Sequence, residues 1–415
     1  MKQQLKLSLL ALFAISFVTA CNDSDDDKKE ETQQEQVQQE QQEQQEEVVE
    51  KKPVKAFVQT VAPDYTSSEV VHVSYDDKQV TSGYFIKDAS DYSLVSYKDA
   101  VYHLGRYSLD TIDKYMTETT DAAVWSYSTQ DSEDSTSRNL YTMAFANEEK
   151  AYVVRYGSPK VWIVNPQATQ AENFKMGELD LSAYGSEHSE STPRAADAIV
   201  TDGKLYIVMQ RLDDSWVANT AYVAVFDTTT DAEIETNASS DDEVMGIPLA
   251  GKNPRENSLF VFENEVFVSS YSQGNLDNSK IEAINTNDFS KRNVITASDI
   301  ADNTTGQIQH TVVESATKGY FVATRVVQSY PDPYMEASTL YQFNPTTGEI
   351  TTANVANTGE EDINFISYDS EGRLWMSVGS DSTPGIDVLD TSSNELSTER
   401  LLTELTPSAI SFIQD

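Results

Sequence analysis

The stretch KLYIVMQRLDDSWVANTAYVAVFDTTTDAEI, residues 204–234, contains two apolar segments and a polar turn. The segments LYIVM and YVAVF consist of β-branched, aromatic and other apolar residues, which favour strands. The segment DTTTDAE that follows is typical of a tight turn, because Asp side chains hydrogen-bond to nearby backbone groups. The stretch therefore predicts two neighbouring antiparallel strands that lead into a turn.

Relatives of the first segment recur along the chain at intervals of 51 to 61 residues. They are DAVYHLGR from Asp99, KAYVVRYG from Lys150, EVFVSSYS from Glu265, KGYFVATR from Lys318 and RLWMSVGS from Arg373. Relatives of the second segment are KVWIVNP from Lys160, KIEAIN from Lys280, TLYQFNP from Thr339 and GIDVLD from Gly385. A further apolar segment precedes each unit, as in DAIVTD from Asp197, and a weaker strand ends it. Four strands in about fifty residues match the period of propeller blades.

The strands are nearly continuous apolar runs with few polar interruptions. Such runs indicate strands that are covered on both faces, as the middle strands of a blade are by its two neighbours. Helical spacing is limited to short segments such as ERLLTEL, residues 399–405. The pattern predicts an all-β fold, a seven-bladed β-propeller of four-stranded blades.

The seventh blade is predicted to combine both ends of the folded region. The C-terminal segment SAISFIQD, residues 408–415, resembles the first strands of the other units. The segments KAFVQTV, VVHVSYD and TSGYFI, from Lys55, Val70 and Thr81, would supply its second, third and fourth strands. Such a joint sheet closes the ring and leaves no open edge between its ends. Six blades with added N-terminal strands, or eight blades, are the alternatives.

This arrangement resembles the YncE-like, surface-layer "YVTN" type of seven-bladed propeller, which is similar in appearance to NHL and WD40-like families. The resemblance covers residues 55–415 and depends on the blade period and the turn pattern. The Trp-Asp dipeptides of WD40 repeats and the Asp boxes of sialidases are absent from the sequence. The resemblance implies that ligands bind on the face where the loops between second and third strands meet the loops between blades.

The N-terminal region predicts export and lipidation. Residues 1–20 have the short basic start and the apolar segment of a signal peptide. The sequence Val18-Thr19-Ala20-Cys21 resembles the lipobox of bacterial lipoproteins, which implies cleavage before Cys21 and acylation, including palmitate, of that residue. The Gln- and Glu-rich residues 21–52 have too few apolar side chains to fold and are interpreted as a disordered tether. Residues 53–415 form the propeller. An outer-membrane lipoprotein facing the periplasm or the cell surface is expected.

The charge of the chain limits its partners. With 68 acidic and 29 basic residues, the net charge is −39, so binding of nucleic acid is disfavoured. Cys21 is the single cysteine, and the sequence contains no pattern for a cofactor or a metal. We expect a monomer attached to the membrane by its N-terminal lipid, with an envelope protein or a small anion as partner.

Four arginines follow or end second strands at nearly the same repeat position: Arg106, Arg155, Arg211 and Arg325. Arginine binds carboxylates and phosphates through paired hydrogen bonds, so a ring of arginines at the tunnel mouth would bind an anion. The alternative is that each arginine pairs with an acidic residue of a neighbouring blade. The loops between blades add His188, Arg194, Arg255 and His310 to the candidate binding residues.

A binding protein is favoured over an enzyme, because the sequence contains no established catalytic motif. The alternative function is a lyase or hydrolase that uses His188 or His310 as an acid or base. His72 and His103 fall within predicted strands and are interpreted as structural.

Overall fold

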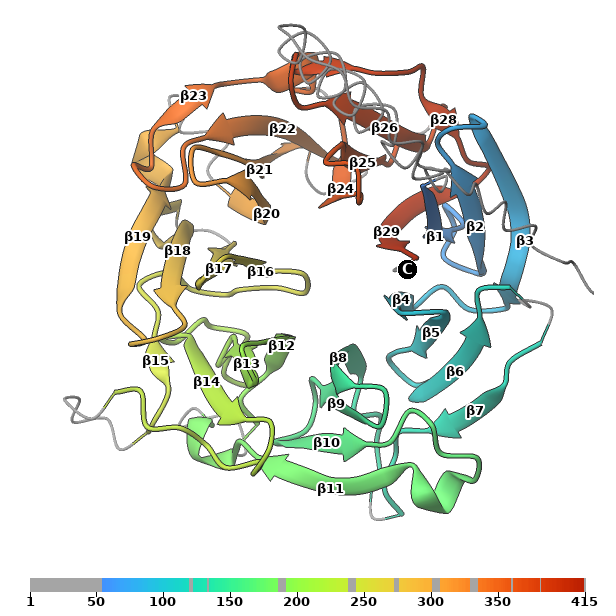
Figure 1. The fold of residues 1–415 in the computed structure, drawn as a ribbon, viewed down its shortest axis with the longest axis vertical. Helices are drawn as coiled ribbons and strands as arrows, with labels where there is room; N and C mark the ends of the chain where they lie inside the picture. Colours follow the sequence, from blue (N-terminus) through green and yellow to red (C-terminus); the bar gives the residue numbers. More distant parts are fainter. Residues whose placement is uncertain are drawn as a thin grey trace, which may run out of the picture. The chain divides into compact units, whose positions relative to one another are not determined.

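The computed structural model describes residues 54–118, 122–132, 134–185, 192–237, 244–271, 276–300, 307–328, 335–359, 361–380 and 382–413. These residues belong to one compact unit, Pro53–Asp415. Its strands form seven antiparallel sheets arranged in a ring, so the predicted seven-bladed β-propeller is confirmed (Figure 1). The alternatives of six or eight blades are wrong.

Blade 1 combines the two ends of the unit in the order β29-β1-β2-β3. Its strands are β1 (Lys55–Val61), β2 (Ser68–Ser74), β3 (Gln79–Lys87) and β29 (Thr406–Phe412). Strand β29 pairs antiparallel with β1, with Val58 opposite Ile410, so the last strand of the chain lies innermost in the first blade. The predicted closure of the ring is therefore confirmed.

The next three blades follow the chain in simple order. Blade 2 is β4 (Tyr92–Tyr97), β5 (Ala100–Gly105), β6 (Thr111–Met116) and β7 (Trp125–Ser128). Blade 3 is β8 (Leu140–Asn147), β9 (Lys150–Arg155), β10 (Lys160–Val164) and β11 (Lys175–Asp180). Blade 4 is β12 (Ala195–Thr201), β13 (Lys204–Met209), β14 (Tyr222–Asp227) and β15 (Ile247–Pro248).

The last three blades have the same order. Blade 5 is β16 (Leu259–Phe262), β17 (Glu265–Ser270), β18 (Lys280–Asn285) and β19 (Lys291–Thr296). Blade 6 is β20 (Gln307–Ser315), β21 (Lys318–Gln328), β22 (Met335–Phe343) and β23 (Ile350–Thr352). Blade 7 is β24 (Ile363–Tyr368), β25 (Leu374–Val378), β26 (Gly385–Asp390), β27 (Glu395–Leu396) and β28 (Leu401–Leu402).

The helical potential of residues 399–405 is not realised. Within this segment, β28 pairs with β26, with Leu401 opposite Ile386. The buried side chain of Leu401 joins the apolar cluster between blades 7 and 1, so tertiary packing overrides the local helical preference. The helices within the described ranges are five 3-10 turns: Ala171–Asn173, Ser182–Tyr184, Leu276–Asn278, Ala297–Asp299 and Val355–Asn357. None of these helices is long and apolar enough to cross a membrane.

The packing of β13 explains its continuous apolar sequence. Leu205 and Ile207 belong to the apolar cluster shared with blade 3, whereas Tyr206 and Val208 belong to the cluster shared with blade 5. Successive side chains of a strand point to opposite faces, so both sets are buried only if a blade lies on each side. This two-sided burial between blades is the main source of apolar stabilisation in the ring.

The two faces of the ring differ in their connections. We call the face with the second-to-third strand loops and the blade-to-blade loops the loop face, and the opposite face the turn face. Tight turns dominate the turn face: Asp227, for example, accepts hydrogen bonds from the backbone N–H groups of Thr229 and Thr230. The innermost strands line the central tunnel between the two faces (Figure 1).

Candidate functional site

Arg155 lies inside the protein, between blades 2 and 3. Its side chain is 2% exposed. It donates to Asp134 at 2.9 Å and to the carbonyl oxygen of Thr129 at 3.2 Å, and it packs on the ring of Trp162. These contacts match the alternative that was considered for the repeat arginines, pairing with an acidic residue of the neighbouring blade.

The other three repeat arginines also have contacts within the chain. Arg106 forms an ion pair with Glu256 at 2.6 Å, which reaches from blade 2 to the loop between blades 4 and 5. Arg211 donates to the carbonyl oxygen of Tyr184 at 2.7 Å, and Arg325 lies 3.4 Å from that of Gly359. Their shared position in the repeat thus brings them to the loop face with four different sets of partners.

A row of stacked side chains crosses the loop face from blade 2 to blade 4. The guanidinium of Arg106 lies 4.4 Å from the ring centre of Tyr141, which stacks on Tyr156 at 4.4 Å. The guanidinium of Arg194 lies 5.5 Å from the ring of Tyr156 and 5.2 Å from that of Trp216. Because cations are attracted to aromatic ring faces, each contact in this row is favourable.

Arg194 and Arg255 are distinctive because aromatic rings, rather than carboxylates, are their main neighbours. The guanidinium of Arg255 lies 3.4 Å from the ring centre of Tyr271. Within the described ranges, no carboxylate oxygen lies within 4.0 Å of Arg255, and Arg194 reaches only the exposed Asp214, at 4.0 Å. The Nε atom of Arg194 is buried without a hydrogen-bond partner among the described groups. Neither cation therefore has a close carboxylate partner among the described residues.

The two guanidinium groups act on the same part of the loop face. Burial raises the pKa of Tyr156 above its usual value, and the positive charges of Arg194 and Arg255 both oppose this rise. Burial likewise raises the pKa of Tyr271 to about 12 against the nearby charge of Arg255. Both phenols therefore stay neutral at physiological pH, so the arginines remain uncompensated by these rings.

A small hollow lies beside Arg255. It is lined by Arg255, Glu256, Ser258, Ser269, Tyr271, Ile308, Gln309 and His310. Ser258 is 4% exposed, and its Oγ atom has no hydrogen-bond partner within the described part of the chain. The carboxylate of Glu256 also lines the hollow, but its charge is offset by Arg106 at 2.6 Å. The hollow thus combines a cation and an unused hydroxyl donor, which is suitable for an anion.

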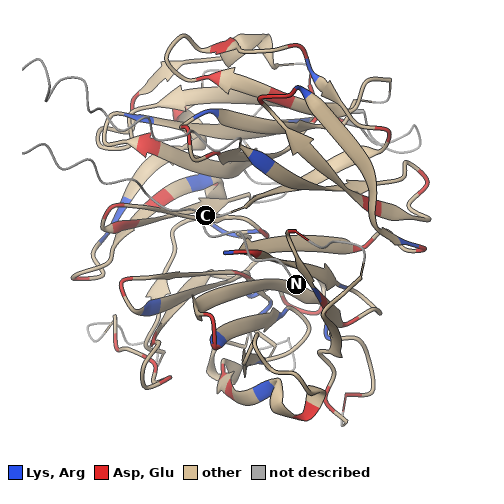
Figure 2. Cartoon of the chain, turned by 45° about the vertical axis from the view of Figure 1, so that its right-hand side comes forward, with Lys and Arg blue, Asp and Glu red and all other residues tan. Residues whose placement is uncertain are grey.

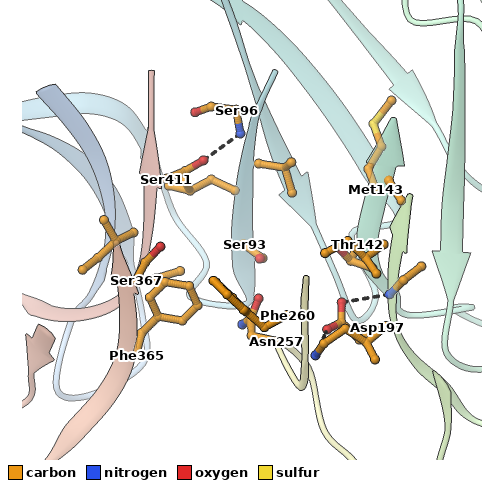
Figure 3. A pocket seen from close by; sticks show the side chains of 18 of the residues that line it. Ser93, Ser96, Thr142, Met143, Asp197, Asn257, Phe260, Phe365, Ser367 and Ser411 are labelled. Carbon is orange, nitrogen blue, oxygen red and sulfur yellow. Dashed lines mark hydrogen bonds between the residues drawn. The ribbon is translucent and has the colours of Figure 1, made fainter. Parts of the chain in front are cut away.

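A larger cavity of about 420 Å³ occupies the tunnel. All seven innermost strands contribute to its wall, including Phe260 on β16, His310 on β20 and Phe365 on β24. Figure 3 shows the side chains of Phe260 and Phe365 pointing toward the same part of this cavity. The carboxylate of Asp197 also lies in the wall, where it accepts the backbone N–H groups of Ala198 and Leu259. Burial raises the pKa of Asp197 to about 7.

His310 is part of the site, whereas His188 lies outside the described residues. His310 has a φ of +24° at a break in the β20–β21 register, a bulge that directs its ring out of the regular ladder. Burial lowers the pKa of His310 to about 4, so the imidazole is neutral at pH 7. None of the carboxylates in the described ranges hydrogen-bonds to it. Its catalytic use together with His188 stays a prediction.

The two remaining histidines are structural, as the sequence predicts. His72 lies in β2 and His103 in β5. His103 is fully buried, and its Nε2 atom lies 2.9 Å from Oε1 of Gln59. Among the residues that the structure describes, no group of three or more His, Cys, Asp or Glu side chains could hold a metal ion.

Tyr141, Tyr156 and Ser258 belong to the site but were not predicted from the sequence. Tyr156 directly follows Arg155 at the end of a second strand, and Tyr271 occupies the place of the repeat arginine in blade 5. Aromatic residues at that repeat position were therefore a usable signal. The stacking partners were not predictable, because Tyr141 and Tyr156 meet Arg106 and Arg194 only through the geometry of the ring.

Comparisons with known proteins identify the fold alone. No family model matches the chain, and no curated protein matches its sequence. Among solved structures, a candidate 6-phosphogluconolactonase of Bacteroides fragilis is similar with a TM-score of 0.59 at 11% identity, covering 87% of this chain and 98% of that one. A Lactobacillus plantarum protein is similar with a TM-score of 0.52 at 12% identity, covering 88% of this chain and 100% of that one. The Dos1 propeller gives 0.50 at 9% identity, with 85% of each chain covered.

These neighbours share the overall fold of this chain. Their coverage extends over the whole ring, so the similarity concerns the complete arrangement of blades. Identities of 12% or less say nothing about shared ligands or reactions. Function must therefore be argued from the side chains of the loop face.

Proposed function

We propose that this chain is a membrane-anchored binding protein of the bacterial cell envelope, whose loop face takes up an anionic ligand. The anchoring is supported by the lipobox-like sequence ending in Cys21 and by the tether that follows it. Two acyl chains or more attach a protein firmly to a bilayer. The tether would then hold the propeller away from the membrane surface with its loop face accessible.

The main support for anion binding is the environment of Arg194 and Arg255. In a chain with 68 acidic and 29 basic residues, carboxylate partners are abundant. Acidic residues are distributed over the strands and loops of the ring (Figure 2). Two arginines that nevertheless lie on tyrosine and tryptophan rings retain most of their capacity for hydrogen bonding. The surrounding rings also restrict access of water, which strengthens an ionic contact.

The anion site can be tested by calorimetric titration of the full chain with benzoate. We expect saturable binding by the wild type and at least tenfold weaker binding by the double variant Arg194→Gln/Arg255→Gln. Arg292→Gln is the matched control, because Arg292 lies on the outer strand β19 and is paired with Glu265 at 2.7 Å. Equal affinity in the wild type and the double variant would disprove the proposed site.

The membrane anchor requires a separate test. Growth with a clickable palmitate analogue should label the wild type and leave Cys21→Ser unlabelled. Labelling of the Cys21→Ser variant, or no labelling of either protein, would disprove the lipoprotein assignment.

A protein partner is the second candidate, favoured by exposed apolar side chains on the loop face. Trp216 is 65% exposed, and Tyr107, Val217, Val326 and Val327 are also exposed. All five lie at or near second-to-third strand connections: Tyr107 in blade 2, Trp216 and Val217 in blade 4, and Val326 and Val327 in blade 6. Exposed Trp, Tyr and Arg are typical of interface anchors. A photoreactive residue in place of Trp216 allows cross-linking at this surface. If this candidate is right, the cross-link captures an envelope protein and the chain does not bind benzoate.

A further inference from the structure

The small hollow beside Arg255 and the tunnel cavity have one wall residue in common, His310. The bulge at this residue moves its ring out of the β20 ladder, and the ring packs 5.4 Å from that of Phe365. The Nδ1 atom lies 3.4 Å from the carbonyl oxygen of Asn257, on the segment that leads from Arg255 into β16. The two spaces therefore adjoin each other at one side chain.

The sizes of the two spaces differ by more than an order of magnitude. The hollow has a volume of about 10 Å³, enough for about one water molecule. It can hold one oxygen atom or the edge of a small head group, so the body of a ligand must lie elsewhere. The tunnel cavity, with about 420 Å³, falls in the range of ordinary small-molecule sites.

The tunnel wall selects against charge in the body of the ligand. Among its described lining residues, Asp197 is the sole Asp, Glu, Lys or Arg, and both of its oxygens accept backbone N–H groups. Three aromatic side chains on neighbouring blades, Phe260, His310 and Phe365, provide flat apolar surfaces. A second aromatic ring can pack on such surfaces by stacking or edge contacts.

We propose that the ligand is an aromatic carboxylate, whose carboxylate binds Arg255 and Ser258 and whose ring lies in the tunnel between Phe260 and Phe365. This inference rests on the proposed anion-binding function, because it places the charged end of the ligand in the same hollow. It adds the chemical class of the ligand and the orientation in which it binds. The carboxylate lies at the tunnel mouth, and the uncharged ring lies inside the tunnel. No covalent step is involved.

The test compares acetate, 3-cyclohexylpropionate and 3-phenylpropionate as probes in calorimetric titrations of the full chain. We expect 3-phenylpropionate to bind at least tenfold more tightly than acetate and at least threefold more tightly than the cyclohexyl compound. Phe260→Leu and Phe365→Leu should each weaken the binding of 3-phenylpropionate at least threefold and leave the affinity for acetate unchanged. Phe289→Leu is the matched control, because Phe289 lies in a turn of the turn face, and it should change neither affinity.

A cavity-filling variant provides a second readout that does not depend on removing an aromatic ring. Ser367 lines the tunnel and is half-buried, so the larger side chain of Ser367→Phe should occupy the space of the ligand's ring. The variant should therefore bind 3-phenylpropionate more weakly, while acetate still binds. If acetate binds through Arg255 but 3-phenylpropionate binds no more tightly, this inference is overturned and the proposed function stands. If none of the three carboxylates binds, the proposed function fails as well.

Discussion

The turn face and the loop face are held together in different ways. On the turn face, Asp227 and Asp390 bond to backbone groups two or three residues further along the chain. On the loop face and in the adjoining tunnel wall, Arg155, Asp110 and Asp197 are buried and contact groups 21 to 62 residues away. Local hydrogen bonds therefore shape the individual turns of the turn face, although contacts such as Lys150 and Tyr152 with Asp231 also join neighbouring blades there. The buried contacts of the loop face named above are all between distant parts of the chain. The side chains left for a ligand lie where the long-range contacts converge.

This difference predicts that substitutions on the loop face have the larger effects on stability. The largest is expected for Arg155→Met, which leaves Asp134 without its buried partner. Breaking such a pair costs about 3–5 kcal/mol of unfolding free energy. Arg138→Met is the matched control, because Arg138 contacts the same carboxylate from a more exposed position and should cost about 1 kcal/mol or less. Urea unfolding measures the loss of unfolding free energy in both variants. Equal losses would contradict the expected difference between the buried and the more exposed arginine.

Asp197 should make stability dependent on pH. Its pKa is raised to about 7 in the folded protein from an ordinary value of 3.8, so the folded state holds a proton that the unfolded state loses. This contribution is complete below about pH 4 and is lost as pH rises through 7, a loss on the order of 4 kcal/mol. Asp197→Asn should flatten this part of the curve relative to the wild type. If the curve of Asp197→Asn instead runs parallel to that of the wild type, this role of Asp197 is disproved.

Asp110→Ala should have an intermediate effect. Asp110 is 1% exposed and accepts the backbone N–H groups of Arg138 and Asn139 at 3.0 and 2.9 Å, which ties blade 2 to the loop before blade 3. Leaving these buried donors unpaired costs about 2–3 kcal/mol. Thermal unfolding should show a clear decrease in Tm, and an unchanged Tm would indicate that the two blades are held by other contacts.

The smallest effect is expected for Asp227→Ala on the turn face. Hydrogen bonds from Thr230 and Thr229 hold the pKa of Asp227 below its usual value, so the turn is stabilised by the ionised carboxylate. Asp227 is half-buried at the surface, and water can replace these bonds. The decrease in Tm should be smaller than for any of the loop-face variants, and a decrease as large as that of Asp110→Ala would break the comparison between the faces.

The sequence predicted the fold well because its signals are local and repeated. The runs around Tyr206 and Val225 are apolar on both faces, and the turns after them contain Asp and Asn, so blade period and strand order could both be inferred. Closure of the ring was predictable because residues 408–415 resemble the first strands of other blades. The short strand Leu401–Leu402 was missed, because two residues, of which Leu401 is buried and Leu402 is exposed, give no periodic signal.

The candidate site was predicted only in part, for a physical reason. Repeat position brings arginines to the loop face, but it does not determine whether a carboxylate or an aromatic ring lies beside each one. Arg155 and Arg211 illustrate this: Asp134 pairs with the first, whereas the guanidinium of the second lies 5.0 Å from the ring centre of Tyr222. Those partners are set by which loops meet over the tunnel, and that depends on the angle between blades rather than on neighbouring residues.

The most direct test of the account is a crystal of the full chain soaked with 3-(4-iodophenyl)propionate, in which anomalous scattering locates the iodine. The account predicts the carboxylate within hydrogen-bonding distance of Arg255 and Ser258, and the iodine in the tunnel beyond Phe260 and Phe365. Iodine bound on the outer surface of the blades, with the tunnel containing solvent alone at a concentration that saturates binding in solution, would contradict it.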